Sequence, residues 1–298
     1  MDIMQVKDLT FIHNEKKRWL KRPEVFQLGP VNLSVKRGET IAIIGENRSG
    51  KSLLAKLLVG ALPADAGEIE INTHKYLAKY QSKDGQQKRT HDIRMILQHS
   101  SESMNPSVPV GKILDEPLRL NTGLSEAERK PIIEDMLVKV GLLREHYYFY
   151  RHMLSDGQQQ RVALARAIVL KPKVLVADEP FAALDPSIRS QTVNLILKLQ
   201  QELGLAFIFI SHNLGIVRHI ADRIIVMEGG EIVEEGKTET IFRWPQHTRT
   251  KKLVTAYQSL VPQNTIREQR AYRLGAVFFE KRTYVPNWHA LLVTKRKP

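Results

Sequence analysis

The chain has 298 residues, 42% of them hydrophobic, and no cysteine. It is long enough to bury a sizeable core, and the absence of thiols excludes disulfides, thiolate-bound zinc and a cysteine nucleophile. The net charge of +13 divides unevenly, with +4 on residues 1–38, −1 on residues 39–242 and +10 on residues 243–298, so the body lacks the basic character typical of a nucleic-acid-binding fold.

Apolar runs in the chain are short. Even the run at residues 206–210 falls far below the roughly 20 residues that span a bilayer. The first ten residues lack the basic-then-apolar pattern of a signal peptide. We therefore expect a chain that stays in the cytoplasm.

In the first third of the chain, short β-branched and apolar segments predict strands. A helical pattern with leucines on one face follows at residues 51–58, and Gly60 and Pro63 end it. The polar stretch at residues 75–92 shows no clear period and predicts a surface excursion. The expected strands are residues 4–6, 31–35, 40–44, 68–71 and 93–97.

The chain then becomes helical, and beyond about residue 171 it alternates strands with helices. This alternation predicts an α/β fold with a parallel sheet, into which the helical stretch at residues 98–171 is inserted. Ser125 and Glu128 have the spacing of a capping box. The expected helices are residues 111–118, 125–140, one from 155, 188–203 and 214–220. The expected strands are residues 174–177 and 206–210, with a hairpin at residues 224–233.

A glycine-rich segment follows the buried strand at residues 40–44 and opens a helix. It fits the phosphate-loop pattern G-x-x-x-x-G-K-[ST] in the context that the pattern requires. Backbone N–H groups would cradle phosphates, Lys51 would reach the β- and γ-phosphates, and Ser52 would offer its hydroxyl to Mg²⁺. The predicted ATP-binding residues are Gly45, Glu46, Asn47, Arg48, Ser49, Gly50, Lys51 and Ser52.

Two further segments carry chemistry that suits a phosphate loop. The strand at residues 174–177 is followed by Asp178 and Glu179. Beside a nucleotide, Asp178 would hold Mg²⁺ through water and Glu179 would polarise the attacking water. The sequence LSDGQ at residues 154–158 opens a helix that Ser155 can cap, which leaves backbone N–H groups free to face an anion.

With these three motifs in order, the sequence resembles the ABC-type ATPase family over roughly residues 4–262. The resemblance implies a P-loop ATPase with a parallel core sheet, an N-terminal antiparallel β subdomain and an inserted helical subdomain at about residues 99–170. A basic tail at residues 263–298 follows the ATPase domain at residues 1–262. The resemblance further implies that Gln98 is the Q-loop residue and a Mg²⁺ ligand, that Asp185 belongs to the D-loop, and that His212 is the switch histidine.

Two ATPase subunits of this family close face to face on ATP and Mg²⁺, which are the implied cofactors. Glu179 would align the water, and His212 would bridge the γ-phosphate to the D-loop side. Gln98 would transmit the closing and opening of the two subunits to the permeases. The signature residues act on nucleotide held by the partner subunit, and in this chain they are Ser155, Asp156, Gly157 and Gln158.

Four short segments resemble one branch of this family in particular. They lie at residues 98–106, 117–122 and 152–154, and after His247. They are similar to the ATP-binding subunits of bacterial oligopeptide and dipeptide importers, and most to the Sap peptide-transport branch, which is linked to antimicrobial-peptide resistance. This branch implies a second, different ATPase subunit and two transmembrane permease subunits whose coupling helices dock near Gln98. It also implies, indirectly, a periplasmic peptide-binding protein, a location on the cytoplasmic face of the inner membrane, and no nucleic acid.

Three positions depart from the family pattern. Arg48 stands where glycine is common, and Asp156 stands in the signature where glycine is usual. The residue that stacks on adenine would be His13 or Phe11. None of these departures removes a catalytic group, so the sequence indicates an active ATPase. The alternatives are an exporter ATPase, a weakly hydrolysing regulatory partner, or a soluble ABC protein that acts on nucleic acid or ribosomes.

Overall fold

The computed structural model describes residues 2–14, 25–72, 74–77, 89, 91–97, 102–182 and 184–260. The strands are β1 (Asp2–Asn14), β2 (Val25–Lys36), β3 (Thr40–Gly45), β4 (Ala66–Ile71), β5 (His74–Leu77), β6 (Ile93–Ile96), β7 (Val174–Asp178), β8 (Ala206–Ile210), β9 (Arg223–Glu228) and β10 (Glu231–Lys237). The helices are α1 (Lys51–Val59), α3 (Val110–Asn121), α4 (Glu126–Lys139), α5 (Asp156–Ile168), α6 (Pro186–Leu203), α7 (Leu214–Ile220), α8 (Thr238–Arg243) and α9 (Thr248–Leu260). None of these helices has the length and apolar character needed to cross a bilayer.

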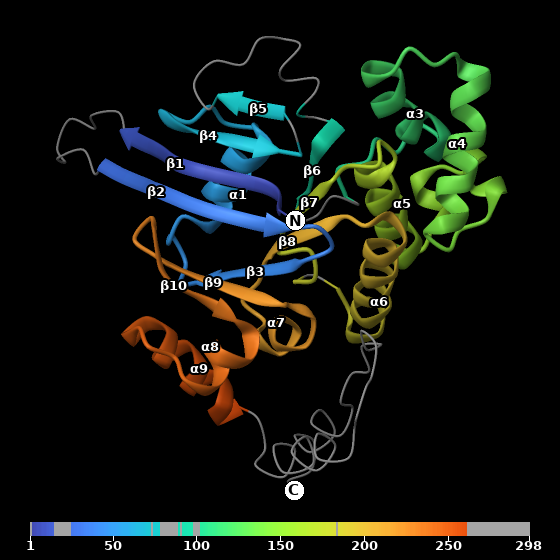
Figure 1. Ribbon diagram of the computed structural model, residues 1–298. Helices are drawn as coiled ribbons and strands as arrows, with labels where there is room; N and C mark the ends of the chain where they lie inside the picture. Colours follow the sequence, from blue (N-terminus) through green and yellow to red (C-terminus); the bar gives the residue numbers. More distant parts are fainter. Residues whose placement is uncertain are drawn as a thin grey trace, which may run out of the picture.

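The strands form two sheets, and helices α3, α4 and α5 stand to one side of them (Figure 1). A four-stranded antiparallel sheet has the order β2-β1-β4-β5, and a six-stranded sheet has the order β10-β9-β3-β8-β7-β6. Within the larger sheet β9, β3, β8, β7 and β6 run parallel, while β10 is antiparallel to β9. The predicted parallel core, N-terminal antiparallel sheet and helical insertion are thus confirmed.

Strand β3 shows why the core sheet is apolar throughout. Ile41 and Ile43 pack with α1 and the four-stranded sheet, whereas Ala42 and Ile44 pack with the helices on the opposite face. A parallel strand covered on both faces needs a continuous apolar run. Because β3, β7 and β8 are parallel, their carboxyl ends lie at the same edge, and the predicted chemical residues follow all three strands.

Parts of the N-terminal region differ from the prediction. The prediction of a surface excursion at residues 75–92 is wrong at both ends, because β5 pairs with β4 and Arg89 is buried. Arg89 Nη2 donates hydrogen bonds to the carbonyl oxygens of Leu57 and Leu58, at 2.5 and 2.7 Å, at the end of α1. Strand β1 extends well beyond the predicted residues 4–6. Register shifts interrupt its pairing with β2, and such shifts break the two-residue period from which a strand is predicted.

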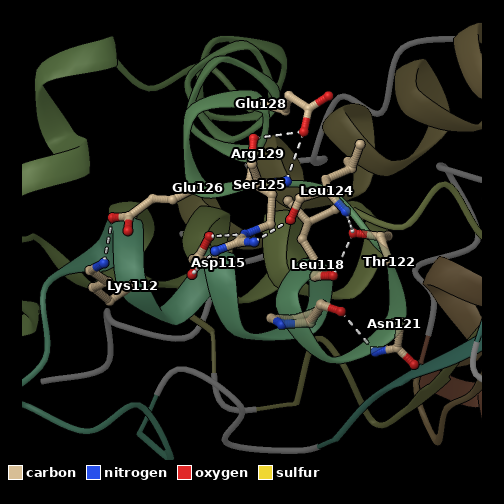
Figure 2. A network of polar contacts seen from close by, with 11 residues as sticks. Lys112, Asp115, Leu118, Asn121, Thr122, Leu124, Ser125, Glu126, Glu128 and Arg129 are labelled. Carbon is tan, nitrogen blue, oxygen red and sulfur yellow. Dashed lines mark hydrogen bonds and ion pairs between the residues drawn. The ribbon is translucent and has the colours of Figure 1, made fainter.

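The helical subdomain is held together by a polar network between α3 and α4 (Figure 2). Arg129 Nε donates to Asp115 Oδ1 at 2.6 Å, and the two side chains are only 10% and 8% exposed. The predicted capping box is present, because the Glu128 carboxylate accepts hydrogen bonds from the backbone N–H and the hydroxyl of Ser125, both at 2.7 Å. This network fixes the helices that support α5.

Replacing Arg129 by methionine should destabilise the helical subdomain. The substitution leaves the Asp115 carboxylate buried without its cation, and an uncompensated buried charge is costly. We expect the melting temperature to fall by about 5 °C or more. Lys112→Met is the matched control, because it breaks the exposed Lys112–Glu126 pair and should shift melting by about 1 °C or less. Equal melting of the two variants, followed by circular dichroism, would contradict this expectation.

Candidate functional site

The predicted phosphate loop lies between β3 and α1, and two of its glycines are required by the backbone. Gly45 has φ +153°, and a Cβ atom there would lie 2.3 Å from the carbonyl oxygen of Met227. Gly50, at the start of α1, has φ +99°. L-residues with side chains rarely adopt either conformation. The loop therefore needs glycine at these positions before any ligand is considered.

Arg48 lies in the same loop with φ +64°. This is the left-handed region, where a Cβ atom clashes with the backbone. The conformation therefore explains why glycine is common at this position in the family that the sequence resembles. The Arg48 side chain is exposed, and because arginine has a Cβ atom, the backbone of the loop is strained at this residue.

Lys51 is folded back onto the loop. Its residue is only 5% exposed, and its ammonium donates hydrogen bonds to Gly45 O at 3.0 Å, Glu46 O at 2.6 Å and Ser49 Oγ at 3.2 Å. Burial lowers the pKa of Lys51, and the negative charges of Glu179 and Asp178 oppose that shift. In this conformation the loop itself satisfies all three donors of the ammonium.

Glu179 follows β7 in a strained backbone conformation, with φ +48°. Its Oε1 lies 3.4 Å from Nε2 of His212, but this buried oxygen has no hydrogen-bond partner among the described residues. Burial and the neighbouring Asp178 raise the pKa of Glu179. Burial, followed by the charge of Lys51, lowers the pKa of His212. A carboxylate with a free acceptor and a raised pKa suits a general base.

One cavity of about 610 Å³ joins these groups, and its size is typical of a small-molecule site. It is lined by Asn47, Arg48, Ser49, Gly50, Lys51, Ser52, Leu53, Asp178, Glu179, Ile210 and His212, together with Phe26. Three segments that are far apart in the sequence thus meet where the parallel strands end. The predicted phosphate loop, acid pair and histidine lie together.

Phe26 is the cavity residue that sequence reasoning missed. It belongs to β2, which was predicted to begin only at residue 31. In the β1–β2 pairing Phe26 lies opposite His13, and Phe11 lies opposite Leu28. Phe11 does not line the cavity, and the side chain of His13 is outside the described residues. The position of Phe26 depends on the register between β1 and β2, so the sequence carried no direct signal for it.

The other predicted site residues lie elsewhere. Ser155 caps α5, since its hydroxyl accepts from the N–H of Gln158 at 3.4 Å and its own N–H donates to Gln158 Oε1 at 2.9 Å. Asp156 is exposed in the first turn of α5, and Asp185 is exposed at the start of α6. None of the four signature residues, nor Asp185, lines the 610 Å³ cavity. Gln98 lies outside the described residues.

A second cavity, of about 860 Å³, borders Glu179 and His212 on the side of α7 and α9. Its lining includes Gly45 but not Lys51, Ser52 or Asp178. The cation and the oxygen ligands that a polyphosphate requires therefore face the smaller cavity.

The residues of the smaller cavity fit a magnesium ion. Mg²⁺ prefers oxygen ligands and usually takes only one or two from protein, with water and phosphate supplying the others. The Ser52 hydroxyl and the Asp178 carboxylate both line the cavity. The described residues contain no group of three or more His, Cys, Asp or Glu that could hold a metal ion.

Comparison with known proteins gives consistent results. A family profile described as "ABC transporter" matches residues 28–182. Two SapF proteins, a "putrescine export system ATP-binding protein" of Escherichia coli K12 and a "peptide transport system ATP-binding protein" of Escherichia coli O6:H1, are each 43% identical over 86% of this chain and 93% of their own. The dipeptide transport ATP-binding protein DppF of Haemophilus influenzae is 43% identical over 88% of this chain and 79% of its own.

A solved structure is similar as well. It is described as a dimeric post-hydrolysis state of the ATP-binding cassette MJ0796 bound to ADP and Pi. It is 27% identical, has a TM-score of 0.66, and covers 79% of this chain and 98% of its own.

Proposed function

The chain belongs to the ABC transporter family of ATPases, and from this premise we propose that it hydrolyses ATP to power peptide transport through separate permease subunits. The observation that carries the proposal is the cavity of about 610 Å³, which joins Lys51 and Ser52 of the phosphate loop to the acid pair and His212. Phosphoryl transfer to water depends mainly on positioning and charge neutralisation, and this cavity supplies groups for both.

We infer the following roles within the cavity. The loop N–H groups and the start of α1 receive the phosphates, and Lys51 exchanges its loop acceptors for phosphate oxygens. Ser52 and Asp178 would hold Mg²⁺, which would neutralise phosphate charge. Glu179 accepts a proton from the attacking water through its unpartnered Oε1, and neutral His212 lies beside it. Phe26 offers an aromatic face at the cavity wall.

The signature residues require a second subunit. They lie at the start of α5, outside the cavity, so we propose that they complete a nucleotide site on a partner ATPase. The exposed Asp156 gains from its place at a helix N-terminus, where its carboxylate can point away from phosphate. The dimeric state of the solved relative supports such pairing. As the resemblance to peptide importers implies, we propose a partner that is a different ATPase chain.

The permeases would dock beside β6, next to the helical subdomain. Cavities of about 240 and 590 Å³ lie there, and Arg166 lines both. Arg94 lines the smaller one, and burial together with the charge of Arg166 lowers the pKa of Arg94. Among the described residues neither arginine has an ion-pair partner. We propose that a coupling helix carrying an acidic residue docks here, at the cytoplasmic face of the membrane, beside Leu97, which precedes Gln98 in the chain.

Transport by a reconstituted complex tests the proposal. Vesicles containing the permeases, this chain and its partner should take up a labelled oligopeptide only with ATP and Mg²⁺. Arg166→Glu should reduce uptake at least about tenfold, because it opposes the incoming acidic residue, while ATP binding by the free subunit stays unchanged. Lys139→Glu makes the same charge change on the exposed face of α4 and should have no effect. ATP-driven movement of putrescine without peptide would overturn the proposed cargo.

A further inference from the structure

Three segments of the chain meet at the phosphate loop. The N–H of Gly230, in the β9–β10 hairpin, donates to Ser49 O at 3.1 Å. Arg249, near the start of α9, reaches across both segments. Its Nε donates to Glu228 Oε1 at 2.8 Å, and its Nη1 makes an ion pair with Glu46. One guanidinium thus joins the C-terminal helix, the hairpin and the second residue of the phosphate loop.

Negative charge close to the phosphate loop is unfavourable for a polyphosphate ligand, and Arg249 links both carboxylates to this region of the chain. Glu46 belongs to the loop itself, and its carbonyl oxygen holds the Lys51 ammonium at 2.6 Å. Charges within a Debye length of about 10 Å still interact at moderate salt. Glu46 is partly exposed, at 57%, so water weakens this interaction without removing it.

Arg249 compensates both carboxylates at once. Its side chain is 23% exposed, less than either partner. It also holds the pKa of the Glu228 carboxyl below its ordinary value, which keeps that carboxylate ionised and paired. His247 Nδ1 is farther from Glu228, at 3.9 Å. Among the described residues, Arg249 is the cation that contacts both Glu46 and Glu228.

We propose that Arg249 is a positioning residue for nucleotide binding, which screens Glu46 and Glu228 from the phosphates and ties α9 to the phosphate loop. The inference rests on the proposed ATP site and adds a residue from outside its motifs. It also gives a function to the first part of the basic C-terminal segment. A guanidinium suits this position because its fork can bond two carboxylates in different directions, whereas an ammonium is a single point charge.

Nucleotide binding by the purified chain tests the proposal. The test removes the positive charge of Arg249 and asks whether removing the negative charge of Glu46 restores ATP affinity. With ATP and Mg²⁺ at about 50 mM salt, Arg249→Ala should raise the dissociation constant roughly fivefold, because two carboxylates lose their cation. Adding Glu46→Gln should bring the value back to within about twofold of wild type, since the negative charge on the phosphate loop itself is gone. At about 0.5 M salt the effect of Arg249→Ala should shrink to less than about twofold.

Controls separate this role from a merely structural one. Lys251→Ala removes one exposed positive charge from the same helix and should leave ATP affinity unchanged. Arg249→Lys should restore at least half of the lost affinity on a logarithmic scale, and this variant keeps the test valid if the alanine variant melts early. In steady-state hydrolysis by the assembled complex, Arg249→Ala should raise KM and leave kcat within about twofold.

Two results would overturn the inference: unchanged ATP affinity in Arg249→Ala, or lowered affinity that Glu46→Gln fails to restore. Failure of the wild-type chain to bind ATP at all would instead overturn the proposed function. The two failures are therefore distinguishable in one set of titrations.

Discussion

Replacing Glu179 by glutamine is expected to reduce ATP turnover by about 10³-fold while ATP affinity changes less than about threefold. Glutamine has nearly the same volume, so the cavity keeps its shape. It lacks the charge that makes the buried Oε1 a proton acceptor, and this oxygen has no other partner among the described residues. Binding depends on the phosphate loop, which the substitution does not touch.

Phosphate release by the complex assembled with its partner and permeases measures the turnover, and equilibrium titration measures the affinity. Glu202→Gln is a matched control, because this carboxylate is exposed on α6 and should not affect either quantity. Wild-type turnover in Glu179→Gln would show that the proton goes elsewhere, and His212, whose Nε2 lies 3.4 Å away, would be the next group to test.

Lys51→Ala should have the second large effect, a loss of ATP affinity of at least about 100-fold. The ammonium is the group that would meet the β- and γ-phosphates, and charge-assisted hydrogen bonds contribute about 1.5–3 kcal/mol each. The substitution also leaves Gly45 O, Glu46 O and Ser49 Oγ without their donor. A lower melting temperature should therefore accompany the lost affinity.

Lys56→Ala separates the two consequences, since Lys56 is exposed on the same helix and should bind ATP as wild type does. Calorimetric titration gives the affinity, and a thermal melt shows whether the variant is folded. Binding by a folded Lys51→Ala protein within about tenfold of wild type would mean that the lysine remains on its loop acceptors when ATP binds.

The phosphate loop was predictable because one short segment contains both the residues that bind phosphate and the glycines that its backbone conformation requires. Gly45 and Gly50 are required by the backbone, and Lys51 follows directly. The acid pair and His212 were predictable together because parallel strands end at one edge of a sheet. For these groups, spacing along the chain and the rules of α/β topology determine the position in space.

Other parts of the site depend on packing between distant segments. Phe26 reaches the cavity because β2 starts earlier than its apolar pattern indicates, and a register between strands is not visible in a single strand. Arg249 and Glu46 are 203 positions apart, and no period links them. Arg89 lies in a polar stretch, yet it is buried because the end of α1 supplies carbonyl acceptors.

The folded-back Lys51 has a consequence for the timing of nucleotide exchange. A buried ammonium without acceptors would be expensive, so a loop that had to release ADP before meeting ATP would otherwise pass through a high-energy intermediate. Here the carbonyls of Gly45 and Glu46 and the hydroxyl of Ser49 compete with the phosphate oxygens for the Lys51 ammonium. Because they belong to the same loop, their effective concentration is very high. The same contacts that weaken ATP binding can therefore speed the departure of its product, and a transporter that must cycle gains from that exchange.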